Sequence, residues 1–300
     1  MKLRSPLAGG GLWQRQGWQL GGYLFLTPAL AVMLLFFGAA MLILLLFSFQ
    51  PFSEGVTLPG TTIANYAYLL HHPYYWTVVL TTLKLGGLAT VVCAVVGYPV
   101  AYALHKVRSP LLRNLSYFAL FSPLMTSVIV RSYGWALLLG DHGLVNSILL
   151  GSHVVSTPVR LLYEFSGVTI SLTHILLPFM VFPILGVLGQ LDPALQQAAA
   201  DLGAGRVRTF TRVTLPLTVQ GVVVGCELVF ALAISAFATP SLLGGGRVQV
   251  LSALVYNDVG GLNWPMASVE SFLLLALALL AIGAFTLLLR GPLARSAGSR

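Results

Sequence analysis

The chain has 300 residues, of which 57% are hydrophobic and 8% are charged, with a formal net charge of +8 and a mean hydropathy of +0.89. Soluble domains usually carry about 25% charged residues, so this composition excludes a soluble globular protein and indicates a polytopic membrane protein. The basic residues are scattered between apolar runs and form no continuous stripe, which argues against nucleic acid as a partner.

Six apolar runs are long enough to cross a bilayer as helices, which requires about 20 residues each. We predict them at 23–49, 76–104, 115–139, 168–188, 217–238 and 269–289. The second run begins beside Tyr74, Tyr75 and Trp76, which are typical of a membrane–water boundary. Pro178 and Pro183 should bend the fourth.

The connections between the runs predict how the chain lies in the membrane. From the N-terminus to the C-terminus they carry three, none, three, one, three, one and three Lys or Arg residues. Because basic residues favour the cytoplasmic side, we expect a multi-pass inner-membrane protein with both termini in the cytoplasm. The chain then divides into a cytoplasmic segment at 1–22, a transmembrane domain at 23–290 and a cytoplasmic tail at 291–300. We expect one short helix at 144–150 and a glycine-rich loop at 240–267.

The cytoplasmic connection at 191–216 has the signals of a helix at both ends. Asp192 can cap the N-terminus, Pro193 suits the first helical position, and Gly203 supplies a left-handed residue after the last turn. These signals predict a helix of ten residues at 193–202.

This predicted helix carries a narrow apolar stripe that has no obvious core to cover it. Its members, at i, i+3, i+4 and i+7, are Leu195, Ala198, Ala199 and Leu202. Three arginines follow before Pro216 opens the next apolar run. A capped helix, a glycine turn and a basic return to the membrane favour a docking surface for a soluble partner.

One spaced motif lies within this connection: Gln197-Ala198-Ala199, three residues, Gly203, nine residues, and then Val-Thr-Leu-Pro ending at Pro216. It resembles the signature loop of the permease subunits of binding-protein-dependent ABC importers, whose pattern is Glu-Ala-Ala, three residues, Gly, nine residues and Ile-x-Leu-Pro. The spacing is complete, but Gln197 lacks the charge of the usual Glu. The resemblance implies an ATPase-coupling loop formed by Asp192, Leu195, Gln197, Ala198, Ala199, Asp201, Leu202, Gly203 and Pro216.

Further stretches resemble the spermidine/putrescine-type subgroup, over roughly residues 20–290. They are GYPVAY at 97–102, SPL at 122–124, RSYGW at 131–135, GLVN at 143–146, LPFM at 177–180, TPSLLGG at 239–245 and LNWP at 262–265. The resemblance implies an all-α type I ABC importer permease fold with six transmembrane helices. It also implies three kinds of partner: ABC ATPase subunits, a second permease in a heterodimer and an extracytoplasmic substrate-binding protein. The substrate would be a polyamine, another small organic ion such as thiamine, or ferric iron.

We single out three charged residues within the predicted spans, where an ionisable group usually faces a cavity or a partner. At 1.5 Å per residue, Lys84 and Arg131 lie about 12 Å below the outer boundary, and Glu227 lies about 4 to 5 Å deeper. We predict an ion pair between Arg131 and Glu227, and we take Lys84, Arg131, Tyr133 and Glu227 as candidates for the translocation pathway or gating. Two cations against one acid would repel a polyamine unless the second permease supplies acids.

No residues suggest catalysis or metal binding. His71 and His72 are adjacent, so they do not face one way, and the glycines at 244–246 are not followed by the Lys-Ser or Lys-Thr pair of a nucleotide-binding loop. We therefore expect no cofactor on this chain, with ATP and Mg used by the partner ATPases. An integral-membrane enzyme would need convergent reactive groups, and a secondary carrier would leave the capped helix unexplained.

Overall fold

The protein is almost entirely helical in the computed structural model, which describes residues 11–53 and 55–297, with side chains over 27–53 and 55–287. Two short strands, β1 (Phe52–Ser53) and β2 (Val56–Thr57), pair in an antiparallel β hairpin. The helices are α1 (Gly11–Ser48), α2 (Ala64–His71), α3 (Pro73–Lys106), α4 (Pro110–Met125), α5 (Val128–Leu139), α6 (Leu144–Gly151), α7 (Phe165–Gly189), α8 (Pro193–Asp201), α9 (Arg206–Thr209), the π-helical turn η1 (Phe210–Thr214), α10 (Leu215–Ser235), α11 (Ala238–Leu243), α12 (Leu251–Gly260) and α13 (Trp264–Ala297).

The predicted all-α membrane architecture is confirmed. Within the described ranges, five helical segments are long and apolar enough to cross a membrane, or six if the bent pair formed by α4 and the segment from α5 to α6 is one span. The short helix predicted at 144–150 is present as α6. The glycine-rich loop predicted at 240–267 is wrong, because this stretch contains most of α11 and all of α12.

The continuous third span predicted at 115–139 is also wrong, because the chain bends by 103° between α4 and the segment that begins with α5. Pro123 lies in the last turn of α4 and weakens it, since proline lacks the backbone N–H. Thr126 then adopts an extended conformation. The Arg131 side chain folds back and donates to the carbonyl oxygen of Pro123, which satisfies a backbone group at the break.

The fifth span begins earlier than predicted. Residue 217 was its expected start, but helical structure runs without interruption from Arg206 to Ser235 through α9, η1 and α10. Pro216 therefore does not mark the boundary of the helix. The wider π-helical turn just before it can accommodate a residue without an N–H.

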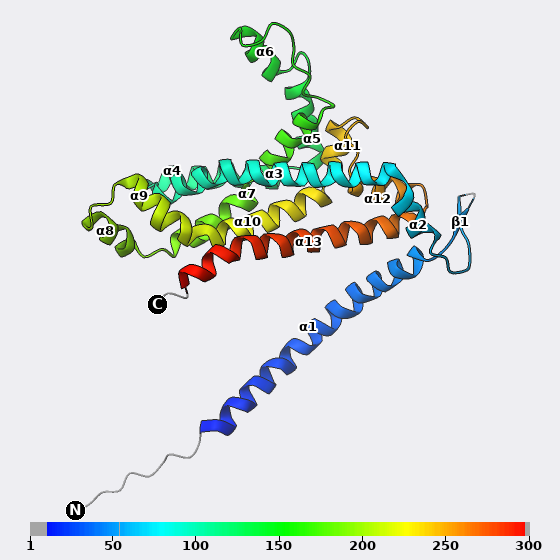
Figure 1. The fold of residues 1–300 in the computed structure, drawn as a ribbon, viewed down its shortest axis with the longest axis horizontal. Helices are drawn as coiled ribbons and strands as arrows, with labels where there is room; N and C mark the ends of the chain where they lie inside the picture. The colour runs from blue at the N-terminus through cyan, green and yellow to red at the C-terminus, as the bar shows by residue number, and fades with distance from the viewer. Residues whose placement is uncertain (1–10, 54, 298–300) are drawn as a thin grey trace, which may run out of the picture.

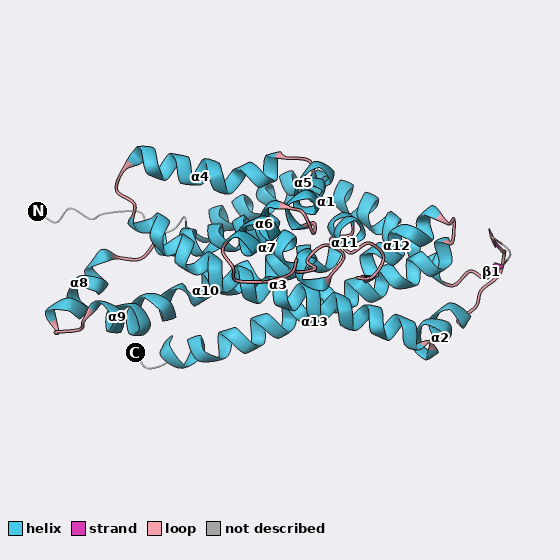
Figure 2. Ribbon diagram, turned by 90° about the horizontal axis from the view of Figure 1, so that it is seen from above, coloured by secondary structure: helices cyan, strands magenta, loops and turns pink. Residues whose placement is uncertain are grey.

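The core lies where α3, α7 and α10 pack together, in the centre of the bundle in Figures 1 and 2. Small residues allow this approach. Met180 of α7 is fully buried between Gly97 of α3 and Gly225 of α10. A Cβ added at Gly97 would lie 2.9 Å from the Met180 Cγ, and one at Gly225 would lie 2.6 Å from its Sδ, so neither position has room for a larger side chain.

Around this core, α13 packs along α10 and α12, whereas α1 diverges from the bundle (Figure 1). The apolar side chains of α1 are widely exposed on this chain, for example 72% for both Leu34 and Phe36. In a membrane these side chains would meet lipid or another protein. The helices α8 and α9 form one end of the bundle, and α2 and the β hairpin form the other (Figures 1 and 2).

Candidate functional site

The helix α8 begins as its sequence predicts. Asp192 is extended at the N-cap, and its Oδ1 accepts a hydrogen bond of 2.9 Å from the backbone N–H of Ala194. Pro193 occupies the first helical position, where no N–H is needed. The observed bounds, Pro193–Asp201, agree with the predicted 193–202 to within one residue.

The C-terminus of α8 is closed by two backbone hydrogen bonds. The N–H of Gly203 donates to Ala200 at 2.9 Å, and the N–H of Ala204 donates to Ala199 at 3.0 Å. This is the Schellman arrangement, in which the residue after the cap is left-handed. Gly203 has φ +80°, so the predicted need for glycine here is confirmed.

The apolar stripe of α8 is largely uncovered on this chain. Leu195 is 43% exposed and Leu202 is 88% exposed, while Ala198 is exposed and Ala199 is half-buried. No residue of α8 is buried by the described part of the chain. The other predicted coupling residues are also exposed: Asp192, Gln197, Asp201, Gly203 and Pro216.

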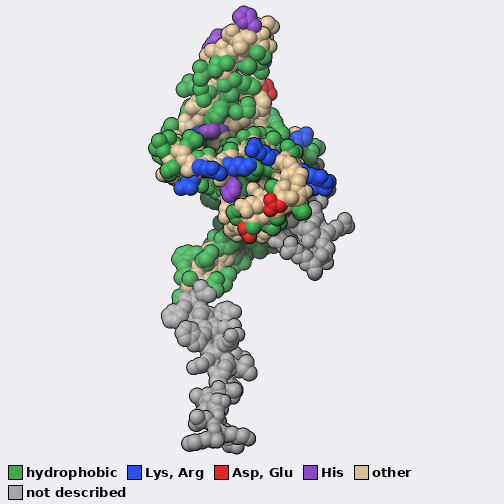
Figure 3. Space-filling model, turned by 90° about the vertical axis from the view of Figure 1, so that its left-hand side faces the viewer, with side chains coloured by type: hydrophobic (Ala, Val, Ile, Leu, Met, Phe, Trp, Pro, Cys, Tyr) green, Lys and Arg blue, Asp and Glu red, His purple; other side chains and the backbone are tan. Residues whose placement is uncertain are grey.

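Basic side chains surround this helix. Figure 3 views the end of the bundle that carries α8 and shows Lys and Arg gathered across it. The exposed basic residues on the segments around α8 are Lys106, Arg108, Arg113, Arg206, Arg208 and Arg212. This end is therefore both apolar along the α8 stripe and strongly cationic around it.

An aromatic cluster links the segment after α8 to α3. Phe210 lies edge-on to Tyr98 and Tyr102, with ring centroids 5.7 and 5.1 Å apart. The Tyr98 hydroxyl is 2.7 Å from the Thr218 Oγ1, and the Lys106 Nζ lies 4.2 Å from the Tyr102 ring centroid. Sequence reasoning missed this cluster, although two tyrosines four residues apart lie on one helix face.

The intramembrane charges are arranged differently from the prediction. Arg131 donates to the Pro123 carbonyl, and the Oε1 of Glu227 accepts a hydrogen bond of 2.6 Å from the Thr286 Oγ1 of α13. No ion pair joins Arg131 to Glu227 in the described ranges, so the predicted pair is wrong. Both residues find neutral hydrogen-bonding partners instead.

The remaining two candidates face outward from this chain. Lys84 is exposed on α3, on the same helix face as Leu80 and Leu88, which are 53% and 43% exposed. Tyr133 of α5 is 59% exposed. Because a charged residue at this depth avoids lipid, the position of Lys84 indicates contact with another subunit or a polar pathway.

Sequence reasoning overlooked a fourth charge within the spans. Glu270 lies in the predicted sixth span and is 1% exposed. It carried the same signal as Glu227, an acid inside an apolar run. Asp258, on α12, lies near it in the structure.

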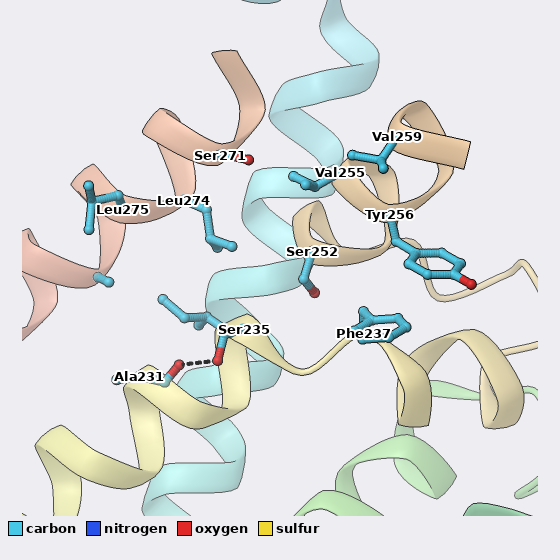
Figure 4. Close-up of a pocket in the computed structure, with 12 residues that line it drawn as sticks. Ala231, Ser235, Phe237, Ser252, Val255, Tyr256, Val259, Ser271, Leu274 and Leu275 are labelled. Carbon is cyan, nitrogen blue, oxygen red and sulfur yellow. Dashed lines mark hydrogen bonds between the residues drawn. The ribbon is translucent and has the colours of Figure 1, made fainter. Parts of the chain in front are cut away.

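An apolar cavity of about 510 Å³ lies between α10, α12 and α13, with Phe237, between α10 and α11, also in its lining (Figure 4). Its polar lining consists of hydroxyl groups, among them Ser235, which donates a hydrogen bond to Ala231 at 2.9 Å. Figure 4 shows Ser252 and Tyr256 on one wall and Leu274 and Leu275 on another.

Residues 93–297 match the family described as binding-protein-dependent transport system inner membrane component. Similar proteins include the spermidine/putrescine transport system permease protein PotB of Haemophilus influenzae, 37% identical over 74% of this chain and 77% of that protein. PotB of Escherichia coli is 39% identical over 71% of this chain and 77% of that protein. The inner membrane ABC transporter permease protein YdcU of E. coli is 32% identical over 91% and 90%.

A solved structure shares the fold. It is a bacterial ABC transporter involved in the import of the acidic polysaccharide alginate, which matches with a TM-score of 0.72 and 20% identity over 94% of this chain and 99% of that chain. The same kind of transporter in complex with an alginate pentasaccharide-bound periplasmic protein matches with a TM-score of 0.73 and 19% identity over 92% and 96%.

Proposed function

Because this chain belongs to the binding-protein-dependent transport system inner membrane components, and is thus a multi-pass permease subunit of an ABC importer, we propose that its solute is a polyamine such as spermidine or putrescine. The observation that carries this proposal is the identity of 37–39% to spermidine/putrescine permeases over about three quarters of the chain. The similarity to alginate transporters, at 20% identity or less, supports the fold alone.

The partners follow from the same proposal. An extracytoplasmic binding protein delivers the solute, a second permease completes the pathway, and ABC ATPase subunits dock on α8 and hydrolyse ATP with Mg. The exposed stripe and the basic residues around it support this docking. Both termini and the loop at 191–216 then lie in the cytoplasm, as the excess of basic residues at that end favours. This chain itself binds no cofactor.

The conformational change of the ATPases is transmitted to the transmembrane helices through helices that pack against α8. Movement of α8 displaces α9 and η1, which pack against it. Phe210 then moves against Tyr98 and Tyr102, so α3 moves with the loop. Since α3 packs on α7 and α10, the helices rock between inward-facing and outward-facing states.

Reconstitution of the complete importer in vesicles tests this function. We expect uptake of radiolabelled putrescine or spermidine that requires ATP, both permeases, the ATPases and the binding protein. Uptake by this chain alone would contradict the importer mechanism. Failure of the purified binding protein to bind any polyamine would contradict the substrate.

A further inference from the structure

The most unusual group in the bundle is the carboxyl of Glu270. It is the seventh residue of α13 and is 1% exposed. Within the described part of the chain, neither of its oxygens has a hydrogen-bond partner. An ionised carboxyl held in this way is strongly unfavourable, so Glu270 requires either a proton or a bound cation.

A second acid approaches it from the neighbouring helix. Asp258 of α12 is half-buried. Burial raises the pKa of Asp258, and its contacts with Glu270 and Asn263 oppose that rise. The two carboxyls lie close together, on the helices α12 and α13 that pack against each other. Two such acids cannot both be ionised unless a positive charge lies between them.

Aromatic residues at the start of α3 lie near both acids. Tyr74 and Tyr75, at the start of α3, are within electrostatic range of both carboxyls. The Tyr75 ring lies 5.6 Å from that of Tyr74 and 6.0 Å from that of Tyr68. Acids together with nearby aromatic rings are the chemistry that recognises an organic ammonium.

The apolar cavity of Figure 4 is lined in part by the two helices that carry the acids, although the acids themselves are not among its lining residues. Val255 and Val259 line it from α12, and Ser271 and Leu274 line it from α13. Asp258 and Glu270 are sequence neighbours of these lining residues, roughly a quarter turn around each helix. An alkyl chain in the cavity could therefore place a terminal cation near the acids.

We propose that Glu270 and Asp258 bind the primary ammonium group of the transported solute, with the apolar cavity beside them holding its methylene chain. This assignment rests on the proposed polyamine function and deepens it. It also removes the difficulty posed by Lys84 and Arg131, because this chain supplies two acids of its own for a cationic solute.

The test is the thermal stability of the complete importer in lipid nanodiscs, titrated with putrescine in the absence of the binding protein. We expect putrescine to raise the unfolding midpoint of the wild type. In Glu270→Gln its apparent affinity should fall about tenfold or more, as expected for the loss of a charge-assisted hydrogen bond. Asp258→Asn should also weaken it. The matched control is Glu164→Gln, which removes a carboxyl that pairs with Arg247 at 3.6 Å, and its titration should equal the wild type.

Three outcomes would overturn the proposal. They are an undiminished response to putrescine in Glu270→Gln, an equal response to diacetylated putrescine, and an equal response to KCl or MgCl₂ at matched ionic strength. If Glu270→Gln does not assemble, Glu270→Asp and Asp258→Asn provide the same comparison. If the binding protein rejects polyamines but the midpoint still responds to putrescine through Glu270, the proposed function fails and the ammonium site stands.

Discussion

Each end of the bundle contains side chains in an unfavourable environment when the chain is alone. At one end apolar side chains are exposed, and at the other end a carboxyl is buried. At the cytoplasmic end in our proposed orientation, α8 exposes apolar groups, with Leu202 88% exposed. At the other end, Glu270 buries a carboxyl that is 1% exposed and lacks a hydrogen-bond partner in the described ranges. An exposed apolar stripe is stabilised when a protein surface covers it, whereas a buried acid is stabilised by a proton or by a bound cation.

Both ends contact the same helix. Tyr74 and Tyr75 lie at the start of α3, and Tyr98 and Tyr102 lie near its end. A helix of 34 residues spans about 50 Å. The proposed docking site and the proposed ammonium site are therefore joined by one continuous element, through which each could influence the other.

The largest effect should come from a bulky side chain placed on the apolar stripe of α8. Ala199 is half-buried and permits close docking, so Ala199→Trp should hold the ATPase away from α8. We expect uptake and binding-protein-stimulated ATP hydrolysis to fall to background while the permeases still assemble. Ala199→Ser, which adds one oxygen, is the control and should retain both. Wild-type uptake in Ala199→Trp would contradict the coupling role of α8.

At the opposite end of the bundle, replacing Glu270 should lower polyamine uptake without lowering the stability of the importer. Glu270→Leu replaces a buried carboxyl by an apolar group of similar size, which is often neutral or stabilising. We expect the unfolding midpoint without solute to stay equal or rise, while polyamine uptake falls about tenfold. A marked drop in the midpoint would instead indicate that Glu270 serves packing.

A smaller loss of coupling should follow from Gly203→Val. No described atom lies within 4 Å of a Cβ built at Gly203, so the side chain would not clash. The φ of +80° would nevertheless cost a β-branched residue about 1–2 kcal/mol. Gly203→Asn, which tolerates this conformation, should retain more stimulated ATP hydrolysis than Gly203→Val. Equal activity in the two variants would show that the turn is not required.

The aromatic cluster should give a partial effect. Phe210→Ala removes both ring contacts with α3, each worth about 0.5–1.5 kcal/mol beyond buried area. We expect ATP hydrolysis to persist with reduced uptake per ATP. Tyr102→Ala should have little further effect in that background, because the contact is already lost. If the losses of uptake in Phe210→Ala and Tyr102→Ala were simply additive, the ring contact between the two residues would not transmit the motion of α8 to α3.

How far the sequence predicted these features depends on the range of the interactions. The helix α8 was predicted to within one residue because its caps, Asp192 and Gly203, act within their own turn. The break after Pro123 was missed because a proline alone does not decide whether a helix breaks: α7 continues as one helix through Pro178 and Pro183. The Arg131–Glu227 pair was wrong because depth along a helix does not say which way a side chain points. Glu270 was visible in the sequence, but its lack of a partner and its approach to Asp258 depend on the packing of α12 against α13.

The smallest effect concerns Arg131 and Glu227, the two residues that were predicted to form an ion pair. Arg131 bonds to the carbonyl of Pro123, and Glu227 accepts from Thr286 of α13, so the two side chains have no partner in common. Groups without shared partners have additive effects to within about 0.5 kcal/mol. Arg131→Gln and Glu227→Gln should therefore lower the unfolding midpoint independently, with the double variant equal to the sum. Thr286→Val should lower the midpoint more than Glu227→Gln does, because the amide oxygen of the new Gln can still accept the hydrogen bond from Thr286, whereas Val cannot donate one. If the double variant were more stable than either single variant, the two charges would have to meet in another state of the transport cycle. Such a contact would lie between the proposed docking site at one end of the bundle and the proposed ammonium site at the other.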